Sequence, residues 1–216
     1  MKKAAQKLKG IYLVVDPAMT EELLLSKLEA ALEGGVSLVQ IWNNWQKNAN
    51  LDSKIGLIDK ISTITAKYQV PLLINEEWKL VKKTSLGGVH FDAIPPDFDA
   101  IQADIAEQAI FGITCSNNLE IIKWAEENAC DYISFCAMYP SASVSSCEIV
   151  SFDTIKKARK ITSKPIFLSG GINPEKITNF KDLNIQGVAV ISGIMSSDSP
   201  ENETREYTKA LKNLQL

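Results

Sequence analysis

The sequence predicts an α/β protein with a single-domain (β/α)8 barrel, and three observations lead to this fold class. Short apolar runs recur along the chain, stretches with helical periodicity separate them, and no Pro/Ser-rich linker or shift in composition divides the block. Strands that are apolar throughout and alternate with helices pair in parallel through right-handed crossovers. A doubly wound open sheet would need a Gly-rich turn after its first strand, where this chain has Asp16-Pro17, so we favour the closed barrel.

Eight apolar runs, each bounded by glycine, proline or a residue that starts a helix, are the expected strands. They are Ile11–Val15, Leu38–Ile41, Pro71–Ile74, Gly88–Phe91, Ile110–Ile113, Tyr132–Phe135, Pro165–Leu168 and Gly187–Ile191. The connections carry helical spacing, for example over residues 23–32 and 121–125. We expect the barrel to span residues 11–216, after a basic leader of residues 1–10. Because the active site of such a barrel lies at the carboxyl ends of its strands, the residues that end each run are the functional candidates.

Composition and charge narrow the class of protein. The chain has 216 residues and a net charge of −3, whereas a nucleic-acid-binding or membrane-surface protein needs a concentrated basic face. No run reaches the roughly 18 apolar residues of a membrane span, and the basic N-terminus lacks the apolar region of a secretory signal. The four cysteines fit neither a CxxC metal site nor a compact disulfide framework. We therefore expect a cytoplasmic protein that acts on small molecules.

Two segments near the C-terminus predict a phosphate site. The expected seventh strand ends in Ser169-Gly170-Gly171, and the eighth ends in Ile191-Ser192-Gly193. Small residues at a strand end leave the backbone N–H groups open to a ligand close to the start of the next helix, which is a common way to hold a phosphate. We therefore predict phosphate binding at Gly170, Gly171, Ile191 and Ser192.

The order of the strand-end motifs resembles the thiamine phosphate synthase/TenI family. The matching pieces are Tyr12–Asp16, Glu33–Gln40, Val70–Asn75, Gly88–His90, Asp131–Ile133 and the two segments of the phosphate site. The resemblance implies a barrel transferase of thiamine biosynthesis, which joins hydroxymethylpyrimidine diphosphate to a thiazole phosphate and releases pyrophosphate with the help of Mg²⁺. It also implies that the hydroxyls of Ser141 and Ser143 help to hold the thiazole phosphate.

The resemblance assigns further residues to the site. Glu76, His90 and Thr114 are the implied catalytic residues, and Glu76 is also the retained carboxylate for a metal ion. The implied substrate pocket consists of Gln40, Trp42, Asn44, Asn75 and Cys115. The implied partners are a small-molecule phosphate substrate and, because barrels of this family often pair, a second copy of the chain; neither nucleic acid nor membrane is expected.

The chain departs from the family pattern where the diphosphate is held. The family's Gln-x-Arg-x-Lys after strand 2 is Gln40-Ile41-Trp42-Asn43-Asn44 here, its Asn-Asp-Arg after strand 3 is Asn75-Glu76-Glu77, and a lysine after strand 6 is Val144. The second metal carboxylate is absent from its expected place after His90. Lys47 is a candidate replacement cation, and Asp92 or Asp97 a candidate metal ligand. Loss of one charge-stabilising donor commonly costs on the order of 10²- to 10³-fold in rate, so we expect synthase activity to be weak or absent.

Two other functions stay open. A metal-independent isomerase of the family's TenI type would act on a thiazole phosphate, but its histidine after strand 5 is missing, and Cys115 is either a substitute proton carrier or a residue that fills the strand end. A non-catalytic protein that binds thiamine phosphate or its precursors is the other option.

Several individual residues also have two readings. Trp42 and Trp45 would either stack on a heteroaromatic ring, or cap the barrel or become buried in a dimer contact. His90 is either functional or structural. Glu76 and Glu77 are expected to open a helix, where carboxylates interact favourably with the dipole.

Overall fold

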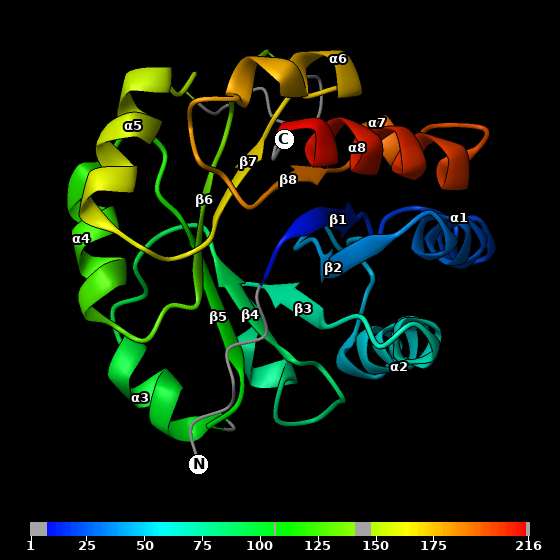
Figure 1. Cartoon of the computed structure of the whole chain (residues 1–216). Helices are drawn as coiled ribbons and strands as arrows, with labels where there is room; N and C mark the ends of the chain where they lie inside the picture. Colours follow the sequence, from blue (N-terminus) through cyan, green and yellow to red (C-terminus); the bar gives the residue numbers. More distant parts are fainter. Residues whose placement is uncertain (1–7, 106, 141–147, 215–216) are drawn as a thin grey trace.

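A computed structural model describes residues 8–105, 107–140 and 148–214, and its eight parallel strands close into one barrel with helices outside it (Figure 1). Each strand pairs with the next along the chain, and β8 pairs with β1, so the predicted (β/α)8 barrel is confirmed. The strands are β1 Gly10–Val15, β2 Val36–Ile41, β3 Leu72–Asn75, β4 Gly88–Phe91, β5 Ile110–Thr114, β6 Tyr132–Phe135, β7 Ile166–Ser169 and β8 Gly187–Val190.

The expected strands differ from these only at their ends. Pro71 and Pro165 precede β3 and β7 instead of starting them, in keeping with the lack of an N–H group for a sheet ladder. Gly10 pairs with Gly187, so the barrel begins one residue before the expected boundary. Leu8 is buried inside the barrel, and residues 1–7 of the expected leader lie outside the described residues.

Helices or turns follow every strand. They are α1 Glu21–Glu33, α2 Leu51–Lys67, α3 Phe98–Asp104, α4 Leu119–Glu127, α5 Phe152–Ile161, α6 Pro174–Ile177, α7 Ser192–Met195, α8 Pro200–Leu214 and the 3₁₀ turns η1 Trp78–Leu80 and η2 Thr178–Phe180. Asn50 and Ser151 show why helices start where they do, because their side chains accept hydrogen bonds from backbone N–H groups of the first turns of α2 and α5. No helix in the described part of the chain is both long enough and apolar enough to cross a membrane.

The helix expected from Glu76 and Glu77 is wrong. Glu76 has a φ of 63°, which is outside the helical range, and only the three-residue turn η1 follows. Glu77 instead forms a half-buried ion pair with Lys54 of α2. The two carboxylates are therefore placed by contacts between elements and not by a helix dipole.

Alternation of side chains along the strands divides the interior. One set packs between the strands and the helices, and the opposite set, which includes Tyr12, Leu73, Tyr132 and Phe167, fills the inside of the barrel. Gly112 makes room for this filling, because a Cβ atom there would lie 2.1 Å from the Tyr132 ring. Further along the same strands, the inward side chains become polar at the carboxyl ends.

Candidate functional site

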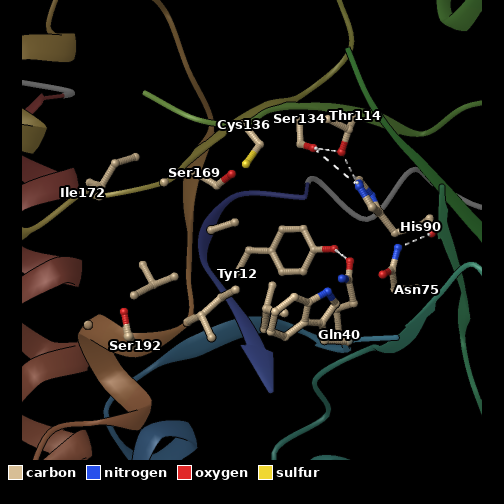
Figure 2. Close-up of a pocket in the computed structure, with 18 of the residues that line it drawn as sticks. Tyr12, Gln40, Asn75, His90, Thr114, Ser134, Cys136, Ser169, Ile172 and Ser192 are labelled. Atoms are coloured by element: carbon tan, nitrogen blue, oxygen red, sulfur yellow. Dashed lines mark hydrogen bonds between the residues drawn. The ribbon is translucent and has the colours of Figure 1, made fainter. Parts of the chain in front are cut away.

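The carboxyl ends of the strands surround a cavity of about 600 Å³, a volume that suits a small organic ligand. Nine of the site residues expected from the sequence line it: Gln40, Trp42, Asn75, His90, Thr114, Gly170, Gly171, Ile191 and Ser192. Figure 2 shows several of them facing the cavity from different strands. The structure thus brings these residues together, while their roles stay predictions.

One end of the cavity is formed by backbone and small side chains after β7 and β8. Gly170 and Gly171 have φ values of 87° and 63°, and a Cβ atom at Gly171 would lie 2.6 Å from the Pro140 carbonyl oxygen. The Tyr207 hydroxyl of α8 donates a 2.7 Å hydrogen bond to the Ile172 carbonyl and fixes the first of the two segments. We call Gly170, Gly171, Ile191, Ser192 and Gly193 the cradle; Ser141 and Ser143, expected to assist it, lie outside the described residues.

A chain of hydrogen bonds between side chains crosses the barrel at the floor of the cavity, and all of its members except Tyr132 line the cavity. The Tyr12 hydroxyl donates to Gln40 and lies 2.9 Å from the Tyr132 hydroxyl, which lies 2.9 Å from His90 Nδ1. His90 Nε2 lies 2.9 Å from Thr114 Oγ1 (Figure 2). Burial lowers the pKa of His90 to about 3, so the imidazole is neutral near pH 7.

Sequence reasoning missed Tyr12, Tyr132 and Ser134 as parts of the site. All three are buried, and Ser134 Oγ lies 3.1 Å from Thr114 Oγ1 at the end of the chain. Burial raises the pKa of both tyrosines, which keeps their hydroxyl protons in place. The one available signal was position, because Ser134 lies next to the end of β6, whereas Tyr12 and Tyr132 lie nearer the starts of their strands.

Two carboxylates lie together at the ends of β3 and β4. The Asp92 backbone N–H donates a 2.6 Å hydrogen bond to Glu76, and the Asn75 amide donates a 3.1 Å bond to the Asp92 carboxylate. Partial desolvation raises the pKa of both carboxyl groups, and the Asp92 charge adds to the effect at Glu76. Asp92 lines the cavity, whereas Asp97 precedes α3.

The residues described by the structure include no group of three or more His, Cys, Asp or Glu arranged to hold a metal ion. The candidate metal site is therefore the Glu76 and Asp92 pair, and water or substrate would supply the other ligands.

Two expected pocket residues lie elsewhere. Cys115 does not line the central cavity but packs in the hydrophobic core, where burial raises its pKa. It is adjacent to the inward-facing Thr114 and so points to the other face of the strand end, which makes it unsuited to carry a proton for a ligand. Asn44 is exposed, and its amide donates 3.0 Å hydrogen bonds to the Asp16 carboxylate.

The two tryptophans have different surroundings. Trp42 lines the cavity, whereas Trp45 packs against the core with Lys54 Nζ 5.0 Å from its ring centre. Lys47, the candidate replacement cation, is exposed on the same loop. Among the described residues that line the cavity, the carboxyl side chains are those of Asp92 and Glu203, and none is lysine or arginine.

The closed barrel and the cavity at its carboxyl ends define a (β/α)8-barrel protein with an open site at the face where such barrels hold their ligands. The family model described as thiamine monophosphate synthase matches residues 11–194, and the chain belongs to this family, as its motifs predict. A thiamine-phosphate synthase of Methanobrevibacter smithii is 31% identical over 94% of this chain and 95% of its own length. One from Clostridium botulinum is 29% identical over 95% of each chain. The structure of thiamine phosphate pyrophosphorylase from Pyrococcus furiosus shares the fold, with a TM-score of 0.81 at 20% identity over 95% of this chain and 96% of the other.

Proposed function

We propose that the protein binds a thiazole phosphate at the cradle and joins it to hydroxymethylpyrimidine diphosphate, the reaction for which its relatives are named. The observation that carries this proposal is one cavity with the cradle after β7 and β8 on one side and Asp92, after β4, on the other; Glu76, after β3, is bonded to the Asp92 backbone but does not line the cavity itself. Two phosphate-bearing substrates that meet end to end need two sites for their phosphates. The cradle would hold one, and a cation bound by the two carboxylates would hold the other.

The lining residues divide the work between phosphate and ring. The cradle offers backbone donors to the thiazole phosphate without a side chain in the way. Trp42 provides an aromatic face, and Gln40 and Thr114 provide polar atoms for a heteroaromatic ring. His90 remains neutral and holds Thr114 through Nε2, which makes it a positioning residue.

The carboxylate pair suits Mg²⁺. This ion usually takes one or two protein carboxylates and fills its remaining positions with water and substrate phosphates. Glu76 and Asp92 offer two neighbouring carboxyl groups, and partial burial raises the pKa of both. These residues would hold the ion, which when bound would neutralise charge on the departing pyrophosphate.

Turnover is expected to be slow. The described lining contains no lysine or arginine, and residues 141–147, which the structure does not describe, contain none in the sequence. Because each absent donor commonly costs on the order of 10²- to 10³-fold, we expect this protein to fall well below an intact relative in rate.

A second candidate function is binding of thiamine phosphate without turnover. The charges in the cavity favour it, since Asp92 and Glu203 suit a ligand that carries a ring cation as well as a phosphate. The isomerase has less support, because Cys115, its candidate proton carrier, is buried in the core.

The test is formation of thiamine phosphate from the two substrates with Mg²⁺, measured by mass spectrometry beside the Methanobrevibacter smithii relative. Slow product formation that chelation and Glu76→Gln abolish supports the synthase. No product, together with calorimetric binding of thiamine phosphate that Gly171→Ala weakens, supports the second candidate. If the protein shows no turnover and does not bind thiamine phosphate, both candidate functions are overturned.

A further inference from the structure

In the hydrogen-bond chain at the floor of the cavity, the Gln40 amide at one end decides which atom of each bond is the donor. Its members, in order, are Gln40, Tyr12, Tyr132, His90, Thr114 and Ser134. They come from β2, β1, β6, β4 and β5, so the chain ties together most of the barrel. All of its members except Thr114 are buried, and the protein has one histidine. Each hydroxyl has one hydrogen and neutral imidazole has one N–H, so each bond constrains the next.

The direction follows from the Gln40 end. Gln40 Oε1 can only accept a hydrogen bond, so the Tyr12 hydroxyl donates its one hydrogen to that oxygen. Tyr12 oxygen can then only accept from Tyr132, whose hydroxyl lies 2.9 Å away. With its hydrogen used, Tyr132 oxygen can only accept from His90 Nδ1. The hydrogen of the neutral imidazole therefore lies on Nδ1.

The other end of the chain follows in the same way. His90 Nε2 carries a lone pair and accepts the hydrogen of Thr114. The Ser134 hydroxyl lies 3.1 Å from Thr114 Oγ1 and 3.5 Å from His90 Nε2, so it donates to one of these two members of the network. Both hydroxyl hydrogens at the cavity floor are used within the chain. Toward a ligand, Thr114 and Ser134 therefore offer oxygen lone pairs.

We propose that Gln40, acting through Tyr12 and Tyr132, is a positioning residue that holds His90 in its Nδ1–H tautomer and so makes Thr114 an acceptor for N–H groups of a ligand. If the Gln40 amide instead presented its nitrogen to Tyr12, every bond would reverse and Thr114 would become a donor toward Ser134. One amide at the rim of β2 thus sets the hydrogen-bonding character of the floor on β5. This inference concerns the protein without a ligand, so it is tested independently of the proposed reaction.

The experiment is ¹⁵N NMR of the imidazole in the full chain without ligand, near neutral pH. With one histidine, both ring-nitrogen signals belong to His90. Their couplings to the ring C–H protons distinguish Nδ1 from Nε2, and their shifts report which of them is protonated. The native protein should show a protonated Nδ1. Tyr12→Phe removes one oxygen atom, frees the Tyr132 hydrogen for Nδ1, and should move the imidazole hydrogen to Nε2.

Two further variants separate this role from a merely structural one. Gln40→Leu removes the terminal acceptor and should also produce the Nε2–H form, whereas Gln40→Glu keeps a carbonyl acceptor and should keep Nδ1–H. The control is Tyr207→Phe, because Tyr207 is a buried tyrosine whose hydroxyl bonds to the Ile172 carbonyl and takes no part in this hydrogen-bond chain. A native Nε2–H tautomer, or a Tyr12→Phe protein whose tautomer equals the native one, would overturn the proposal. Should Gln40→Leu fail to fold, Tyr12→Phe still decides it.

Discussion

The backbone N–H of Asp92 donates a 2.6 Å hydrogen bond to the carboxylate of Glu76. This bond joins the loop after β4 to the residue after β3 and brings Glu76 close to Asp92, which is the member of the pair that lines the cavity. The partner of Glu76 is thus the second residue after His90, whereas the family pattern places a metal carboxylate further along the chain.

Removal of either carboxylate should abolish the effect of Mg²⁺. We expect Glu76→Gln and Asp92→Asn each to lower Mg²⁺-dependent product formation by on the order of 10²-fold, because charge on the pyrophosphate would no longer be neutralised. Steady-state rates across a Mg²⁺ titration measure this. Glu77→Gln is the matched control, since the Glu77 carboxylate pairs with Lys54 whereas that of Glu76 bonds to the backbone of Asp92. Equal losses in all three variants would contradict the assignment.

The cradle requires glycine at position 171. Gly171→Ala places a Cβ atom 2.6 Å from the Pro140 carbonyl oxygen at a φ of 63°, and we expect a loss of roughly 1–3 kcal/mol in the free energy of unfolding. Binding of inorganic phosphate, followed by calorimetry, should weaken as well. Gly56→Ala in α2 is the control, because nothing lies within 4 Å of a Cβ atom added there. Helix propensity predicts that this change raises the free energy of unfolding by about 1 kcal/mol.

Glu203 should oppose phosphate binding. Its side chain lines the cavity from the first turns of α8, near Tyr207, whose hydroxyl would lie 2.3 Å from a Cβ atom on Gly193 of the cradle. We expect Glu203→Gln to tighten inorganic phosphate roughly fivefold, which corresponds to about 1 kcal/mol of like-charge repulsion, and less in high salt. Glu201→Gln, on the same helix but paired with Arg205, should leave the affinity unchanged. Unaltered affinity in Glu203→Gln would place the phosphate elsewhere.

His90 should make stability fall in acid. Its pKa is about 3 in the folded protein and near 6.5 unfolded, so between these values the unfolded chain binds more protons. The free energy of unfolding therefore rises with pH in this window, by up to about 1.4 kcal/mol per pH unit from this group. Urea unfolding of the native protein and of His90→Gln from pH 4 to pH 7 isolates the contribution as a difference in slope. Parallel curves would show that His90 titrates normally.

The tryptophans should separate binding from stability. Trp42→Ala removes an aromatic face of the cavity and should weaken thiamine phosphate binding by roughly tenfold, as expected for loss of ring stacking. Trp45→Ala should instead lower the unfolding free energy, because that ring packs against the core. Calorimetry and chemical unfolding of both variants would reveal a reversed pattern if the assignment were wrong.

The sequence alone determined the barrel, its strands and part of the cavity lining. Buried parallel strands are continuous apolar runs, and their carboxyl ends meet at one face, so Gln40, Asn75, His90 and Thr114 could be grouped without coordinates. The cradle was also predictable, because Gly170 and Gly171 meet a local backbone requirement that the sequence displays directly.

Only the tertiary structure decided which of the residues next to these face the cavity and which residues they contact. Thr114 and Cys115 are adjacent, and which of them faces the cavity depends on the parity of β5 within the closed sheet. Asp92, rather than Asp97, meets Glu76 because the loops after β3 and β4 lie side by side. The contact of Tyr12 with Tyr132 joins residues that are 120 positions apart. Such contacts depend on how the strands are placed around the barrel, which local patterns along the chain do not encode.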